Sequence, residues 1–227
     1  MSDAIERIDA GLAHEVVAPA IVRDLNPTLI VVHGRGASAT DLLPLADALG
    51  REDLLTIAPQ APYQFRGSFG LGYAWYELQE IGRPDERTFS VSLEKFLAFL
   101  DRVREGYPVD PERLVLLGFS QGAVMSLATA VREPRRASAV AALSGYLDAY
   151  SRPVAESSAV QDLPVFIGHG VQDELIAVSF GREARDTLKG LGAQVTYHEY
   201  PAPHTITQPE VGDVRTWLNA TIGAPRE

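Results

Sequence analysis

Residues 118–122 read Gly-Phe-Ser-Gln-Gly, a G-x-S-x-G pentapeptide that has the composition of a serine nucleophile site. The short apolar run at 114–117 predicts a strand buried on both faces, and the small and apolar residues at 123–131 favour a helix. A strand, a tight turn and a helix are the context in which this pattern lifts a hydroxyl out of a fold. The flanking glycines suit the close backbone approach of such a turn. We therefore expect Ser120 to act as a nucleophile.

A serine hydroxyl becomes a good nucleophile only when a base takes its proton and an acid orients the base. On a parallel sheet these partners should follow strands and come in the order serine, acid, histidine. Asp173 fits the acid because it follows the predicted strand at 164–167 through a short glycine-containing loop. Asp162 precedes that strand and would lie at the wrong edge. Glu174 is the nearest rival, and a solvated loop carboxylate is the alternative interpretation of Asp173.

Only one of the five histidines has the place in the chain that the base requires. His204 follows the last predicted strand in a loop downstream of both Ser120 and Asp173, so we expect it to be the base. The other four precede the nucleophile, lie too close to the acid in sequence or fall inside a strand: His14, His33, His169 and His198.

An oxyanion hole needs two backbone N–H groups that point at the developing negative charge. We expect one from Gln121, which follows the nucleophile, and one from Arg35 in the glycine-containing loop at 33–36. The guanidinium of Arg35 either faces solvent or contacts a polar substrate, and the sequence leaves both alternatives open.

These residues must be positioned by a scaffold, and the hydrophobic pattern predicts one in which strands alternate with helices. This alternation predicts an α/β fold with a mostly parallel sheet and helices on both faces, built as one domain over 1–227. We expect a loose N-terminal segment at 1–11 and an edge hairpin at 12–22. Strands are predicted at 28–32, 54–58, 114–117, 137–143, 164–167 and 194–200, and helices at 41–49, 89–103, 123–131, 180–191 and 208–219.

The aromatic-rich stretch at 60–87 is predicted to be irregular. It could face the substrate or could be a loop held by aromatic anchors, and the two interpretations are evenly balanced. Phe65, Phe69 and Trp75 are its candidates for substrate contacts.

Composition excludes several classes of protein. The net charge of −10, without a basic run, argues against a nucleic-acid partner, and the absence of cysteine excludes a thiolate zinc site. No apolar segment is long enough to span a bilayer, and no signal peptide is visible, so we expect a cytoplasmic protein. We expect a monomer or homodimer that acts on a small-molecule ester without a cofactor or metal.

Together the motifs resemble the phospholipase/carboxylesterase family of α/β-hydrolases, which includes acyl-protein thioesterases. The resemblance extends from about residue 29 to residue 218 and rests on His33-Gly34-x-Gly36, the pentapeptide at 118–122, His169-Gly170-x-x-Asp173, and His204 before a terminal helix. It implies an α/β-hydrolase fold without a large lid domain and a cofactor-free serine esterase for small to medium acyl esters or thioesters. Relatives often have an apolar residue at the position of Arg35, a glycine at that of Ala123 and a proline soon after the acid. These departures leave the triad intact and argue against long-chain or lipidated-protein substrates.

Three other interpretations compete with a serine esterase. Residues 34–39 match G-x-G-x-x-A after a strand, but a dinucleotide site also needs a carboxylate after the next strand, which here ends Ala58-Pro59-Gln60. A silent binding protein on a hydrolase scaffold should lack a triad member, and none is missing. A hydrolase of lactones or amides would use the same triad and stays open.

Overall fold

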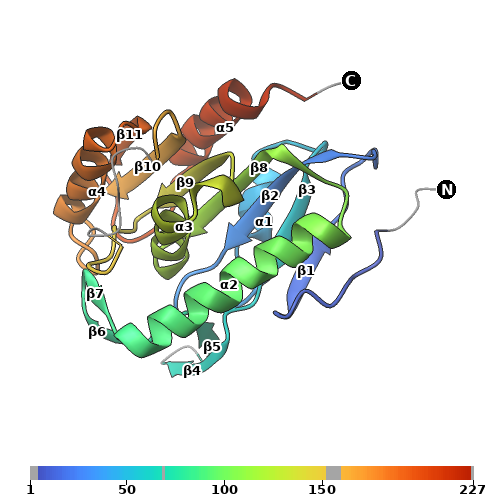
Figure 1. The fold of residues 1–227 in the computed structure, drawn as a ribbon. Coiled ribbons are helices and arrows are strands. Elements are labelled where there is room, and N and C mark those ends of the chain that lie inside the picture. The colour runs from blue at the N-terminus through green and yellow to red at the C-terminus, as the bar shows by residue number, and fades with distance from the viewer. Residues whose placement is uncertain (1–4, 68–69, 152–159, 226–227) are drawn as a thin grey trace.

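A twisted sheet forms the centre of the computed structural model, which describes residues 5–67, 70–151 and 160–225 (Figure 1). In this described part the sheet has seven strands in the order β1-β3-β2-β8-β9-β10-β11. All neighbours are parallel except β1, which pairs antiparallel with β3 at the edge. The strands are β1 (His14–Val17), β2 (Asn26–Val32), β3 (Leu55–Pro59), β8 (Val109–Phe119), β9 (Ala139–Leu143), β10 (Pro164–Gly170) and β11 (Gln194–Tyr200). This sheet confirms the predicted fold class.

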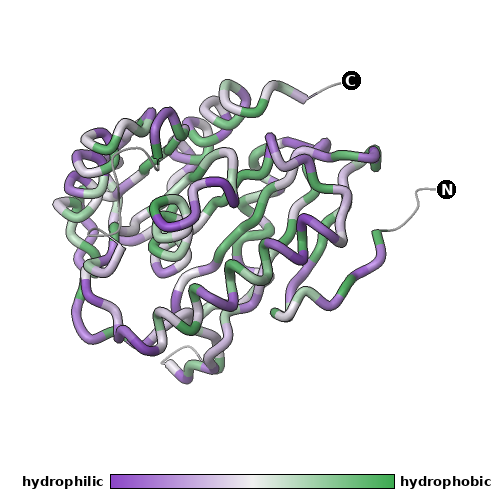
Figure 2. The backbone as a smooth tube through the Cα atoms, viewed as in Figure 1, coloured by the Kyte–Doolittle hydropathy of each residue, from purple (hydrophilic) through white to green (hydrophobic). Residues whose placement is uncertain are grey.

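The central strands are buried on both faces, which is why their sequences are continuous apolar runs. Ile30 and Val32 of β2 belong to one hydrophobic cluster, whereas Leu29 and Val31 belong to a second cluster on the opposite face. This alternation follows from the two-residue period of a strand. Figure 2 shows the hydrophobic segments gathered at the centre of the molecule.

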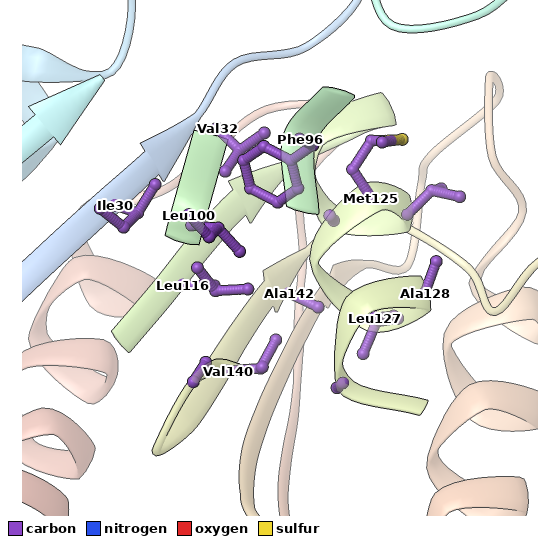
Figure 3. Packing of buried hydrophobic residues seen from close by; sticks show 14 of the residues in the cluster. Ile30, Val32, Phe96, Leu100, Leu116, Met125, Leu127, Ala128, Val140 and Ala142 are labelled. Carbon is purple, nitrogen blue, oxygen red and sulfur yellow. The ribbon is translucent and has the colours of Figure 1, made fainter. Parts of the chain in front are cut away.

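Helices cover both faces of the sheet. The first cluster packs against α2, α3 and α4, and the second packs against α5 and the residues around α1. Figure 3 shows Phe96 and Leu100 of α2 and Met125 and Leu127 of α3 beside strand residues such as Leu116 and Val140. The helices are α1 (Leu43–Ala48), α2 (Glu86–Gly106), α3 (Gln121–Arg132), α4 (Val178–Gly190) and α5 (Gln208–Ile222), with a short 3-10 helix η1 (Pro134–Arg136).

Several helix ends differ from the predicted ones by two or three residues, and at the start of α2 the difference comes from a capping side chain. Helix α2 begins three residues before the predicted start, where the carboxylate of Asp85 accepts a hydrogen bond from the N–H of Thr88 at 2.9 Å. No helix in the described part of the chain is long and apolar enough to cross a membrane.

The stretch at 60–87 is more regular than its sequence predicts. It contains two short antiparallel hairpins, β4 (Tyr63–Gly67) with β5 (Gly70–Ala74) and β6 (Leu78–Glu80) with β7 (Arg83–Pro84). In β4, Tyr63, Phe65 and Gly67 are half-buried and the residues between them exposed, the alternation of a strand with one covered face. The glycines at 67, 70 and 82 hid this pattern.

The N-terminal part also differs from expectation. The hairpin predicted at 12–22 is absent from the described structure: β1 pairs with β3 of the main sheet instead. The segment at 5–11 is held rather than loose, because Ala10 is buried and the N–H of Ile8 donates to the hydroxyl of Tyr107 at 3.1 Å. Residues 1–4 lie outside the described residues.

Phe96 tests how the core supports the site. Its ring is fully buried and meets Trp75 edge-on, with 5.4 Å between the ring centroids. Replacing Phe96 with alanine should lower the free energy of unfolding by about 3–5 kcal/mol through lost burial and a residual cavity. Val91 on the same helix is 37% exposed. Val91→Ala should therefore change the free energy of unfolding by less than about 0.5 kcal/mol. Urea denaturation gives both values, and similar losses in the two variants would contradict this description of the core.

Candidate active site

Ser120 occupies a turn of one residue between β8 and α3. Strand β8 ends at Phe119 and α3 begins at Gln121, and Ser120 lies between them with φ 55° and ψ −119°. A positive φ is uncommon for a residue with a side chain and stores strain. The N–H of Ser120 donates to the carbonyl of Leu143 at 2.9 Å, so the neighbouring strand β9 helps to hold the turn.

The two glycines of the pentapeptide are required by steric contacts. A Cβ on Gly118 would lie 2.2 Å from the carbonyl oxygen of Gly122, and a Cβ on Gly122 would lie 1.9 Å from that of Val32. Both distances are far below van der Waals contact. The turn can therefore form only if neither position has a side chain.

The structure brings Ser120, His204 and Asp173 into one hydrogen-bonded chain. The Oγ of Ser120 lies 3.0 Å from Nε2 of His204, and Nδ1 of the same ring lies 2.6 Å from Oδ2 of Asp173. The carboxylate accepts, so Nδ1 carries the proton and leaves the Nε2 lone pair free to accept from the serine hydroxyl. The Phe119 ring lies 4.9 Å from the His204 ring, centroid to centroid, and limits its movement.

Asp173, the expected acid, accepts a hydrogen bond from His204, whereas its rival Glu174 is exposed. The Asp173 side chain is fully buried, and its Oδ1 accepts hydrogen bonds from the N–H groups of Leu175 and Ile176 at 2.9 and 2.8 Å. These two bonds fix the carboxylate so that Oδ2 faces the imidazole. The local loop 173–176 thus orients the acid.

The other four histidines have structural environments, as their places in the chain predict. His14 is buried, with Nε2 2.7 Å from the hydroxyl of Tyr107, and His198 stacks on Phe166 with ring centroids 5.6 Å apart. His169 is buried and donates from Nε2 to the carbonyl of Ile176 at 2.8 Å. Burial lowers the pKa of His169, which keeps the ring neutral beside Asp173.

His33 supports the loop that carries Arg35, a role that the sequence did not indicate. Its Nε2 accepts from the N–H of Ala61 at 3.1 Å, so Nδ1 bears the proton and donates to the carbonyl of Gly34 at 2.7 Å. Burial lowers the pKa of His33 and keeps the ring in this neutral form. The only available signal was the His-Gly pair after a strand.

The loop at 33–37 is also clamped to the hairpin that follows it. The N–H of Gly36 donates to the carbonyl of Tyr73 at 2.7 Å, and the N–H of Tyr73 donates to the carbonyl of Ala37 at 2.9 Å. A Cβ on Gly72 would lie 1.9 Å from the carbonyl oxygen of Gly36, so the two segments touch through their backbones. Arg35 therefore lies in a loop fixed before any ligand binds.

Gln121 supplies a helix-terminal N–H and ties α3 to the segment that follows the β4-β5 hairpin. As the first residue of α3, its N–H has no carbonyl partner within the helix. Its side chain is buried, accepts from the N–H of Trp75 at 3.0 Å and donates to the carbonyl of Tyr76 at 2.9 Å. Both expected oxyanion residues line one cavity with Ser120.

That cavity has a volume of about 540 Å³ and a mostly apolar lining. Its size is typical of pockets for small ligands. Apolar side chains line it from strands β4, β6 and β8 and from loops: Phe65, Leu78, Ile81, Phe119, Leu175 and Ile176. It is an opening of the right size for an acyl chain next to the serine hydroxyl.

The three candidate substrate contacts have different outcomes. Phe65 lines the cavity, whereas Phe69 lies outside the described residues. Trp75 does not line the cavity: its side chain is fully buried, and its indole N–H donates to the carbonyl of His33 at 2.9 Å. The aromatic stretch thus contains residues of both expected kinds: Phe65 lines the cavity, and Trp75 anchors the loop.

Glu210 is a buried carboxyl group in the first turn of α5. Its Oε2 accepts from the N–H of Thr207, and its own N–H donates to the Thr207 hydroxyl, both at 3.3 Å, which forms a capping box at the start of α5. Its Oε1 has no hydrogen-bond partner in the described part of the chain. Burial raises the pKa of Glu210 to about 7.

Comparison with known proteins gives consistent matches over almost the whole chain. A model of the phospholipase/carboxylesterase family matches residues 13–222. A relative from Emericella nidulans named acyl-protein thioesterase 1 is 29% identical, over 91% of this chain and 96% of its own length. The crystal structure of esterase PE8 superposes with a TM-score of 0.80 and 26% identity, covering 92% of this chain and 99% of that one. A carboxylesterase from Mesorhizobium loti has the same fold at 21% identity, with a TM-score of 0.79 and coverage of 92% and 95%.

Glu210 should make stability fall with rising pH. Because its pKa is higher in the folded state than its usual value of 4.5, the folded chain binds more protons between about pH 4.5 and 7, and the free energy of unfolding decreases through that window. The expected loss is about 3 kcal/mol. Glutamine at this position preserves the capping box but does not titrate. In Glu210→Gln the pH-dependent loss of unfolding free energy should therefore be absent. Urea denaturation at pH 5 and pH 8 measures it, and parallel behaviour of the two proteins would contradict the buried proton.

Proposed function

The chain belongs to the phospholipase/carboxylesterase family, and from that membership we propose that it is a serine hydrolase that cleaves carboxylic esters through an acyl-enzyme on Ser120. One observation carries the proposal: a continuous hydrogen-bonded chain from the serine hydroxyl through His204 to the Asp173 carboxylate. This arrangement is what acyl transfer by a serine requires.

The proposed reaction has two halves that use the same residues. His204 accepts the proton of Ser120 at Nε2 while the oxygen attacks the ester carbonyl, and Asp173 stabilises the resulting imidazolium. His204 then donates that proton to the departing alcohol, which leaves the acyl group on Ser120. Water takes the place of the alcohol, gives its proton to His204 and attacks the acyl-enzyme, so the acid is released and Ser120 is regenerated.

The oxyanion of each tetrahedral intermediate is assigned to the backbone N–H groups of Arg35 and Gln121. Support comes from the cavity that both residues line with Ser120 and from the place of Gln121 at the start of α3, where its N–H has no carbonyl partner within the helix. The clamped loop at 33–37 would present its amide without reorganisation, which is the condition under which such donors are most effective.

Thioesters are a second candidate substrate class because the Emericella nidulans relative is named an acyl-protein thioesterase. A thioester carbonyl can be attacked by the same serine, and the reaction differs only in the leaving group. Parallel assays with a p-nitrophenyl ester and an acyl-CoA of the same chain length distinguish the two.

Ser120→Ala tests the nucleophile. Removing the hydroxyl should lower kcat for p-nitrophenyl butyrate on the order of 10⁴-fold, while the circular dichroism spectrum stays that of the unmodified protein. Ser179→Ala, at an exposed position in the first turn of α4, is the matched control and should keep full activity. A Ser120 variant that retains most of its turnover would exclude this residue from the mechanism.

The apolar lining predicts a preference for acyl chains of intermediate length. Each added methylene that becomes buried contributes about 0.8 kcal/mol, so kcat/KM should rise up to about fourfold per methylene from the acetyl ester onwards. The rise should stop once the cavity of about 540 Å³ is filled. A p-nitrophenyl ester series from two to sixteen carbons measures this, and equal values across the series would contradict binding of the acyl chain in the cavity.

A further inference from the structure

Arg35 contributes the only cationic side chain among the described residues that line the cavity. The sole charged residue besides it in that lining is Asp41. The remainder is apolar, aromatic or glycine, apart from Ser120, Gln121 and His204 of the proposed machinery. Any charge preference of the cavity must therefore come from Arg35 and Asp41.

The guanidinium of Arg35 is held in place by an aromatic ring. Its central carbon lies 4.3 Å from the centroid of Phe65, so the cation rests over the ring face. Stacking occupies the face of the guanidinium and leaves its N–H edge for an acceptor. The backbone on both sides is fixed as well, since Gly36 and Ala37 bond to Tyr73 of the hairpin that carries Phe65.

Within the described part of the chain, no carboxylate forms an ion pair with Arg35. Other arginines are paired: Arg51 with Asp53 at 2.7 Å, and Arg182 with Glu199 at the same distance. Asp41 lines the cavity but lies outside ion-pair distance of Arg35. In a chain with thirty acidic and twenty basic side chains, this cation at the cavity has no acidic partner of its own there.

We infer that the site prefers esters that carry a carboxylate a few carbons from the scissile bond, and that the guanidinium of Arg35 binds that carboxylate. The inference rests on the proposed function, because the amide of Arg35 is assigned to the oxyanion. That assignment puts the guanidinium within one side-chain length of the carbonyl under attack. A planar guanidinium can hold a carboxylate with two parallel charge-assisted hydrogen bonds.

The carboxylate can belong to the acyl group or to the alcohol, and matched substrates separate these sources. Monomethyl glutarate has it on the acyl side, and 4-acetoxybutanoate has it on the alcohol side. The primary amide of each compound has the same shape without the charge. The measured quantity is the ratio of kcat/KM for the acid to that for its amide, which cancels any general loss of catalytic power.

In the unmodified protein at least one ratio should be about tenfold or more, expressed mainly in KM. Arg35→Gln should bring it close to one, and Arg35→Lys should retain part of it. Arg66→Gln is the matched control: Arg66 is exposed in the same hairpin strand, adjacent to Phe65 and absent from the cavity lining, so its ratio should match that of the unmodified protein. Asp41→Asn should raise the ratio by removing the opposing charge.

Salt provides a second readout that needs no variant. Because Arg35 is exposed, added NaCl should lower the ratio by screening. Acid-to-amide ratios of one or less for both the acyl-side and the alcohol-side pair would overturn the inference and leave the proposed function standing. A ratio that Arg35→Gln leaves unchanged would do the same. Absence of turnover for all four esters and for p-nitrophenyl butyrate would overturn both the proposed function and the inference on Arg35.

Discussion

The backbone contact between Gly122 and Val32 is the constraint on which the arrangement of the site depends. Strands β2 and β8 are neighbours in the sheet, with Val32 opposite Gly118, so the loop after β2 and the turn after β8 emerge side by side. Gly122 approaches Val32 so closely that a Cβ would overlap its carbonyl oxygen. The same register therefore sets the position of the Ser120 turn and its separation from the loop that carries Arg35.

Neutral polar groups, rather than ion pairs, hold the two loops around this contact. Buried His33 uses both ring nitrogens and its carbonyl, and the side-chain amide of Gln121 bonds the backbone at Trp75 and Tyr76. Each of these groups would be costly to bury without a partner, so the native arrangement is favoured over loops that leave them unpaired. The result is a rigid support for amides that are proposed to bind an oxyanion.

Much of the fold was predictable because apolar periodicity reports burial directly. The run at 114–117 predicted a strand buried on both faces. Chain order after strands singled out His204, which contacts Ser120, and Asp173, which contacts His204. The β4-β5 hairpin was missed because glycines interrupt its alternation. Trp75 was assigned to the substrate because residue type alone cannot distinguish a ring facing a cavity from one that donates to a buried carbonyl.

The cation stacked on Phe65 and the buried carboxyl of Glu210 lay beyond sequence reasoning for a related reason. Both depend on contacts between segments far apart in the chain: the Arg35 loop with a hairpin, and α5 with the backbone of β10, where a Cβ on Gly168 would meet Glu210. From the sequence alone, Glu210 is indistinguishable from an ordinary glutamate in the first turn of a helix. Only the fold removes it from water.

We propose that a carbonyl under attack by Ser120 has its oxygen held by the amides of Arg35 and Gln121. A crystal structure of the protein after reaction with an alkyl fluorophosphonate tests this directly, because the phosphonyl oxygen of the adduct occupies the oxyanion position. We expect the phosphorus to be bonded to Oγ of Ser120 and the phosphonyl oxygen to lie about 2.7–3.1 Å from both amide nitrogens. An adduct on another residue, or a phosphonyl oxygen turned away from both amides, would contradict it.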